Sequence, residues 1–242
     1  MSIADKLTTI AENEQKVYDK GVEDGRTQEW SDFWDYYQNN GKAQGYNYAF
    51  AGTTWVNDIF RPKHNFVCTT TQQMFFQSAI TDLAGLLDSR GLTFDTSRVT
   101  WSNQMFMHSS ITHIPTINMS KSAGDSANNY MFYSQSIHTI DKIVMAETVA
   151  YGAQIFGLAT GLKNLTIEGV IGRTLSISSS PLTVESAKSV INALKNYAGT
   201  DKELTYKLTL NSTVWTALNN AETPPSGETW KEYVQTLGWQ CA

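Results

Sequence analysis

The side chains best suited to metal binding or acid–base chemistry are two histidines that lie in corresponding repeated segments. His113 and His138 each belong to an Ile-x-x-Ile phrase. If these phrases form adjacent strands, the two imidazoles could approach one another and ligate a metal ion such as zinc. No carboxylate or thiol has a matching position, and a histidine on a strand surface is ordinarily solvated. We therefore expect neither a bound metal nor a cofactor.

Paired carboxylates that could hydrolyse a glycosidic bond are the next candidates. Glycosidases place two Asp or Glu side chains on either side of the scissile bond. Asp82, Asp141 and Glu168 occur at non-equivalent repeat positions, so the sequence predicts no such pair. It also lacks the Gly-x-Gly-x-x-Gly, Walker lysine-loop, Gly-x-Ser-x-Gly and His-Glu-x-x-His motifs. We expect a protein that is not an enzyme.

The two thiols and the overall composition give further expectations. Cys68 and Cys241 are far apart in sequence, so they predict no disulfide framework, and Cys68 is expected in the core. The net charge of -5 and the pI of about 5.4 provide no basic surface for nucleic acid. The sequence contains no apolar run of about 18 residues, so it predicts no membrane-spanning helix. The start of the chain lacks the basic and apolar regions of a signal peptide.

The elements that would position these side chains are repeats. Met105-Phe106 is followed by Ile111 and Ile114, and Met131-Phe132 is followed at the same spacing by Ile137 and Ile140. Successive phenylalanines of the repeats are 31, 26 and 24 residues apart. Such a unit buries its apolar face only by stacking on its neighbours, which predicts one continuous core. The predicted repeat-core residues are Phe75, Ile80, Leu83, Phe106, Ile111, Ile114, Phe132, Ile137, Ile140, Phe156, Leu162 and Leu165.

The spacing predicts an α/β repeat fold in which each coil of a solenoid contributes one short parallel strand. We assign residues 42–183 to this solenoid. Residues 46–55 read as a degenerate first coil, and polar pieces such as residues 118–129 read as loops between coils, where a solenoid would place recognition. Pro115 lies inside one strand segment, where it removes a backbone donor and should break the ladder locally.

One phrase resembles a known repeat family. Leu162-Lys163-Asn164-Leu165-Thr166-Ile167 is similar to the leucine-rich-repeat phrase L-x-x-L-x-I, and a phenylalanine six residues before its first leucine resembles the BspA-like class of irregular bacterial leucine-rich repeats. The resemblance covers residues 50–183. The asparagine usual after the strand is missing. The resemblance implies an irregular leucine-rich-repeat solenoid.

The N-terminal residues 1–41 predict an acidic helical arm. Ile3, Leu7, Ile10 and Val17 form a narrow apolar seam that is too short for a stable free coiled coil. The seam therefore needs a surface to bury it, which could be its own domain, a partner groove or copies of itself. The arm holds nine acidic and four basic residues, so it carries the whole net charge of the chain. This separation favours anchoring or oligomerisation.

Helices are also expected at both ends of the solenoid. Trp30, Phe33, Trp34 and Tyr37 would give one aromatic helix face. That face would either cover the open N-terminal end of the solenoid or form an exposed carbohydrate- or partner-binding surface. Residues 184–242 read as a helix-strand-helix cap, with helices over 184–198, 214–221 and 230–237 and a strand over 206–210.

The arrangement of the whole chain resembles small repeat proteins encoded among the structural genes of tailed bacteriophages and prophages of gut bacteria. The resemblance rests on the Ile-Ala-Asp-Lys-Leu start, the Tyr-Ala-Phe-Ala-Gly phrase and the Gly-Trp near the end. It implies a virion component of a tail, baseplate or fibre, assembled in the bacterial cytoplasm. Its partners would be other virion proteins, reached through the arm, and a host-surface protein or glycan. We expect a homo-oligomer, with a trimer favoured. A BspA-like surface adhesin and an intracellular protein-binding scaffold are the alternatives.

Overall fold

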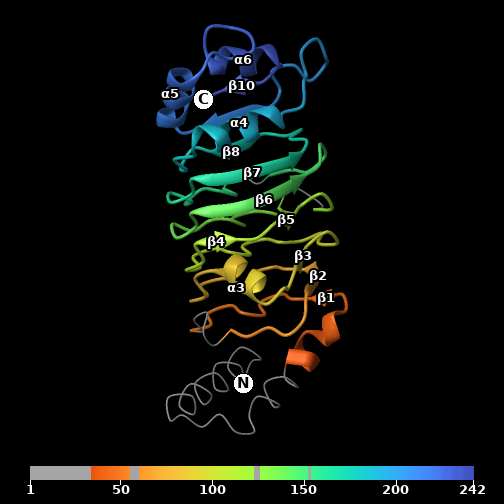
Figure 1. The fold of residues 1–242 in the computed structure, drawn as a ribbon. Coiled ribbons are helices and arrows are strands. Elements are labelled where there is room, and N and C mark those ends of the chain that lie inside the picture. Colours follow the sequence, from red (N-terminus) through yellow and green to blue (C-terminus); the bar gives the residue numbers. More distant parts are fainter. Residues whose placement is uncertain (1–33, 55–59, 123–125, 152–153) are drawn as a thin grey trace.

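The computed structural model describes residues 34–54, 60–122, 126–151 and 154–242, which form an elongated parallel β-solenoid of about four turns (Figure 1). The strands are β1 (Gln44–Gly45), β2 (Phe66–Thr70), β3 (Phe94–Asp95), β4 (His113–Ile114), β5 (Ile117–Asn118), β6 (Thr139–Met145), β7 (Asn164–Gly169), β8 (Leu175–Ile177), β9 (Lys207–Leu210) and β10 (Gln240–Cys241). The helices are η1 (Asn39–Gly41), α3 (Leu83–Ser89), α4 (Val184–Asn192), α5 (Ser212–Ala221) and α6 (Trp230–Thr236). None of these helices is long and apolar enough to span a membrane.

Every strand pair in the described chain is parallel, as expected for a solenoid. The sheets have the orders β1-β2-β3, β4-β6-β5 with β7 also on β6, and β10-β9-β8. β4 and β5 both pair with β6, and Pro115 stands between them. The predicted break in the ladder at Pro115 is therefore confirmed. It splits the strand of this coil in two.

A column of phenylalanine rings runs through the solenoid from Phe50 to Phe156. The rings of successive coils stack with centroids 5.2, 5.6, 5.9 and 5.1 Å apart. All twelve predicted repeat-core residues are buried, and they belong to one core cluster that runs from Trp34 to Trp239. The predicted continuous core is confirmed. The stacked rings are Phe50, Phe75, Phe106, Phe132 and Phe156.

Each of these phenylalanines sits in a tight turn, and in the turns of Phe50, Phe75, Phe106 and Phe132 the backbone hydrogen bonds alternate in direction. The N–H groups of Gln73, Phe75 and Gln77 donate to carbonyls of the next coil at 2.8–3.0 Å. The N–H groups between them donate within the turn, three residues back. The alternation leaves no backbone donor of this turn unpaired, which a buried backbone requires. The turns are residues 46–53, 71–78, 102–109, 127–134 and 154–159.

The alternation forces a left-handed backbone on residues that are not glycine. The residue two places before the phenylalanine has a φ between +56° and +58° at Tyr48, Gln104 and Tyr130 and of +51° at Gln73. Side chains other than glycine adopt this region rarely, at a cost of roughly 1–2 kcal/mol each. The interlocked hydrogen bonds of adjacent coils hold these residues there. This conformation could not be predicted from these residues, because glycine or asparagine is its usual signal.

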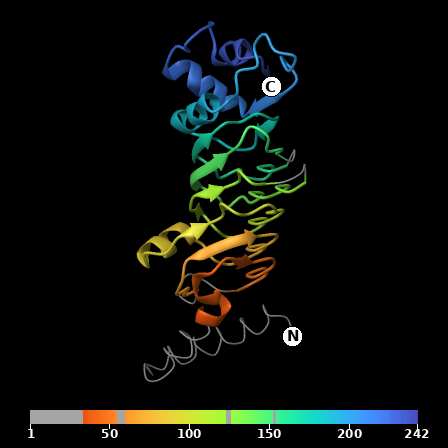
Figure 2. The same ribbon diagram turned by 90° about the vertical axis from the view of Figure 1, so that its right-hand side faces the viewer.

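One coil departs from the expected strand. The segment after Ile80 was expected to be β-structured, but Leu83–Ser89 forms α3. The side chain of Asp82 accepts a hydrogen bond from Gly85 N at 2.8 Å and so caps the helix. Leu83 and Leu87 then fall on one buried face. This repeat is 31 residues long, so it has room for the helix, which projects from the body of the solenoid on the strand side (Figure 2).

Both ends of the solenoid are covered by further residues. Trp34 is buried against Phe50 and Phe60, so this part of the predicted aromatic face packs on the first coil. At the other end α4, α5 and α6 surround β8, β9 and β10 (Figure 1). The helix expected over 184–198 ends at Asn192. Trp30, Phe33 and the seam of Ile3, Leu7, Ile10 and Val17 lie outside the described residues.

Candidate binding surface

The strand side of the solenoid carries a cluster of charged side chains that contact one another across coils. His113 lies between two carboxylates of neighbouring coils, with Nδ1 3.4 Å from Asp82 Oδ1 and Nε2 2.6 Å from Asp141 Oδ1. Lys142 and Glu168 form an ion pair at 2.7 Å on adjacent strands. We call the outward side of β4, β6 and β7, together with Asp82, the strand face. Its charges are therefore paired across coils, in the Lys142–Glu168 ion pair and in the contacts of His113 with two carboxylates.

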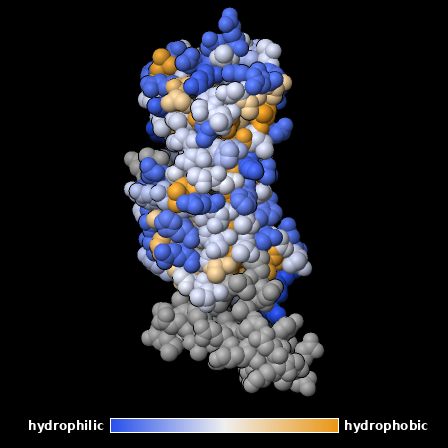
Figure 3. Space-filling model, turned by 90° about the vertical axis from the view of Figure 1, so that its left-hand side faces the viewer, coloured by the Kyte–Doolittle hydropathy of each residue, from blue (hydrophilic) through white to orange (hydrophobic). Residues whose placement is uncertain are grey.

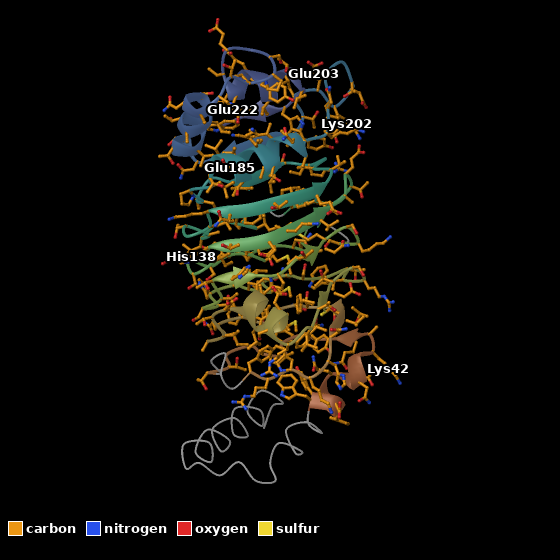
Figure 4. The ribbon with its side chains drawn as sticks, in the orientation of Figure 1. Lys42, His138, Glu185, Lys202, Glu203 and Glu222 are labelled. Atoms are coloured by element: carbon orange, nitrogen blue, oxygen red, sulfur yellow. The ribbon has the colours of Figure 1, made fainter. Side chains whose placement is uncertain are left out.

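The two histidines considered for metal binding are not brought together. Both ring nitrogens of His113 face carboxylates. His138 is exposed at one edge of the body, away from the other labelled side chains (Figure 4). No group of three or more His, Cys, Asp or Glu side chains in the described chain has the arrangement of a metal site. The sequence could not show the Asp82–His113–Asp141 contact, because it depends on the register between coils.

The two carboxylates beside His113 do not face an open space. The imidazole of His113 occupies the gap between Asp82 and Asp141. A glycosidase needs that gap for the scissile bond or for water. Glu168 is one coil further along and is paired with Lys142. The arrangement stabilises the strand face rather than presenting an acid and a base to a substrate.

The thiols are also unsuited to chemistry. Cys68 is fully buried in the core, as expected, and burial raises the pKa of its thiol. Cys241 is partly exposed, and desolvation raises the pKa of its thiol to about 11, against a smaller opposing effect of Lys231. A thiol reacts as the thiolate. Both side chains are therefore held in the unreactive form at neutral pH.

The back of the solenoid is chemically different from the strand face. The five turns, residues 46–53, 71–78, 102–109, 127–134 and 154–159, stack on the side opposite the strands (Figure 2), and we call this side the turn face. None of these turns contains Asp, Glu, Lys or Arg. Asn or Gln stands three residues before the phenylalanine in four of them, at Asn47, Gln72, Asn103 and Asn129. The turn face is therefore uncharged and rich in amides.

We call the Asn and Gln side chains of the turns the amide ladder. Hydrogen bonds between coils hold part of it in place. Asn47 Oδ1 accepts from Gln72 N at 2.9 Å, and Asn103 Nδ2 donates to Ser126 O at 3.1 Å. Gln73 Nε2 donates to Gln104 Oε1. Each amide has one donor and one acceptor side, so the groups not used between coils remain available at the surface. The amides of Asn47, Gln73, Asn103 and Gln104 are thus held in place by contacts between coils.

A groove opens at the N-terminal end of the turn face. It has a volume of about 850 Å³, and its walls include Asp35, Tyr36, Tyr37, Asn39, Asn40, Gln44, Gly45, Tyr46, Asn47, Tyr48, Ala49 and Ala51. Asp35 is neutralised by contacts with Lys63 and His64, which lower the pKa of its carboxyl group. Burial raises the pKa of the Tyr46 phenol, whose hydroxyl lies beside Gln44 without a hydrogen bond of good geometry.

The floor of the groove is a row of backbone acceptors. In the later coils the carbonyls at these positions accept hydrogen bonds from the preceding turn, as Gln72, Met74 and Phe76 do. The equivalent residues of the first described turn are Asn47, Ala49 and Ala51, and no described residue donates to their carbonyls. All three line the groove. The first turn thus offers ordered acceptors where the stack of described turns begins.

The side between the two faces is only weakly polar. There the chain passes from each turn to the next strand through short segments such as Ser109-Ser110. The surface on this side is mostly pale, with scattered orange patches (Figure 3). No large apolar area is visible on this side. The turn face with its groove is therefore the best candidate for recognition.

Comparison with protein-family models, curated proteins and solved structures finds no match to this chain. The function is therefore argued from the geometry and composition of its surfaces. Sequence reasoning looked for recognition in the loops between coils and overlooked the turns. The sequence does contain a signal for this surface, since every turn lacks Asp, Glu, Lys and Arg.

Proposed function

We propose that this protein is a non-enzymatic display module whose rigid solenoid carries a recognition surface for a host-surface molecule. The observation that supports this most directly is the separation of its surfaces, with paired charges on the strand face and an uncharged, amide-rich turn face. A continuous ring column holds both faces in fixed register. Preformed surfaces bind with a smaller loss of conformational entropy.

We further propose that the module is a virion component of the tail, baseplate or fibre, with repeats of the irregular leucine-rich type. Its partners would be other virion proteins and copies of itself. The resemblance of the sequence to phage-encoded repeat proteins supports this assignment, as does the concentration of the net charge in residues 1–41. The apolar seam of Ile3, Leu7, Ile10 and Val17 would be buried in a partner groove or a trimer.

The mass of the protein in solution tests the assembly proposal. Light scattering of the full chain should give a multiple of 27.0 kDa, with three copies favoured. A shortened chain that begins at Thr27 should have the mass of one chain and retain its circular dichroism spectrum. A monomer at both lengths would contradict self-assembly through the arm. Unfolding of the shortened chain would show that residues 1–26 belong to the core.

A further inference from the structure

The exposed aromatic side chains among the described residues lie in the groove or within two coils of it. Among its large apolar residues, those that are strongly exposed are Tyr36 at 88%, Tyr48 at 50%, Trp101 at 38%, Val170 and Leu204. Tyr36 and Tyr48 line the groove. Gly45, which lines the groove, pairs with Thr70 of the next coil, and Thr71 N donates to Trp101 O of the coil after that. Trp101 therefore occupies the position of Gly45 two coils further along. At ~4.8 Å per coil, this is about 10 Å along the axis.

We propose that the groove and the adjoining turn face bind an uncharged polysaccharide that lies along the solenoid axis. This inference rests on the proposed recognition function and names its ligand class. Sugar hydroxyls are both donors and acceptors, and the groove offers both, with the carbonyls of Asn47, Ala49 and Ala51, to which no described residue donates, beside amide side chains. The C–H faces of sugar rings pack on aromatic rings, whose faces are electron-rich. Tyr48 and Trp101 provide two such rings.

The same surface fits other ligands less well. An acidic glycan or a nucleic acid would need basic side chains, and the turns contain none. A peptide that paired with the carbonyls of the first turn would run across the axis and leave Trp101 uncovered. Protein interfaces are commonly anchored by apolar and arginine side chains. A chain of sugars along the axis uses the groove, the amide ladder and Trp101 together.

The test is affinity electrophoresis of the full chain in native gels that contain one polysaccharide each. The panel would be amylose, mixed-linkage β-glucan, mannan and galactan, with alginate as the charged comparison. We expect at least one uncharged polymer to retard the protein, equally at low and high salt, and alginate to have no effect. Retardation by alginate alone, or by no polymer, would overturn the proposal.

Matched variants locate the site. Tyr48→Ala and Trp101→Ala should each raise the dissociation constant about tenfold, the factor expected from the loss of one aromatic contact. Leu204→Ala is the control, since Leu204 is 49% exposed with φ +55° and Tyr48 is 50% exposed with φ +58°. It should bind as the unchanged protein does. Equal binding by all three variants would overturn the assignment of the site.

The same samples separate this proposal from the assembly proposal. The mass of each variant by light scattering should equal that of the unchanged full chain. A multimer that no uncharged polysaccharide retards would refute the glycan site and leave the virion proposal standing. A chain that is monomeric with or without residues 1–26, yet is retarded through Tyr48 and Trp101, would refute self-assembly and leave the glycan site standing.

Discussion

Asp82 shows how one side chain can serve two neighbouring coils. Its carboxylate caps α3 through Gly85 N and lies 3.4 Å from the imidazole of His113 in the next coil. The cap is local, whereas the second contact depends on the stacking of coils. Both groups are partly exposed, so the ion pair alone contributes little. The helix cap is expected to be the larger of the two effects.

Substitution of Asp82 separates these contributions. Asp82→Ala should lower the free energy of unfolding by about 1–2 kcal/mol, because it removes the cap and one neighbour of His113. Asp82→Asn keeps a capping oxygen and should cost less than half as much. Urea unfolding followed by circular dichroism measures both. Equal losses for the two variants would mean that the negative charge, and not the cap, is what stabilises this site.

The thiols provide a prediction at the level of single groups. Because the pKa of Cys241 is raised to about 11, only about one in ten thousand of these thiols is ionised at pH 7. Reaction with Ellman's reagent should be slow and should accelerate about tenfold per pH unit from 7 to 9. Cys68 should react only after unfolding, since it is buried. Rapid release of two equivalents from the folded protein at pH 7 would contradict this.

The Cys241→Ser variant is the control for this assignment. In the folded state it should show no reaction over the same period. In concentrated denaturant it should release one equivalent, against two for the unchanged chain.

At the scale of elements, the coil is the unit of stability. Each coil presents the same ring, the same turn and the same direction of hydrogen bonds to its neighbours. The stability of a repeat protein is approximately a sum of coil terms and neighbour terms. A defect in a central coil therefore weakens two interfaces, whereas a defect in a terminal coil weakens one.

The ring column makes this testable. Phe106 stacks on Phe75 at 5.6 Å and on Phe132 at 5.9 Å. Phe106→Ala should lower the free energy of unfolding by about 3–5 kcal/mol, because it leaves a cavity between two fixed rings. Phe106→Leu should lose less, since leucine fills part of the space. A loss below about 1 kcal/mol in the alanine variant, by urea unfolding, would show that the column does not support the fold.

The sequence predicted the elements that depend on apolar spacing and missed those that depend on backbone detail. The spacing of residues such as Phe106, Ile111 and Ile114 was enough to predict stacked coils, and Pro115 was enough to predict where a strand breaks. The helix at Leu83–Ser89 was missed because its aliphatic spacing suits a strand as well. The left-handed turns were missed because Gln73 and Gln104 carry no turn signal.

The same limit applies to the candidate site. Its groove depends on the position of Tyr36 relative to Tyr48, which only the packing of Trp34 on the first coil determines. The ladder on the strand face depends on a register that the sequence does not state. The uncharged character of the turns, by contrast, can be counted from the sequence once the repeats are aligned.

At the scale of the whole molecule, identical contacts between coils imply that the number of coils can change. Inserting three extra copies of residues 106–131, one repeat period, should yield a folded protein that is longer by about 14 Å, at ~4.8 Å per coil. Small-angle scattering measures the maximum dimension. An insertion of half a period is the control, and it should aggregate because it places polar residues in the core. Failure of the full-period protein to lengthen would contradict the coil as the unit.

The alternating hydrogen bonds of the turns also give the molecule a polarity that restricts its symmetry. In every described turn stack the N–H groups point from one coil to the next in chain order, so the carbonyls of Asn47, Ala49 and Ala51 are acceptors at the starting end. A two-fold axis through this end would bring acceptor against acceptor. Two copies therefore cannot join head to head through these turns. Assembly of two copies at this end would need donor groups from outside this turn.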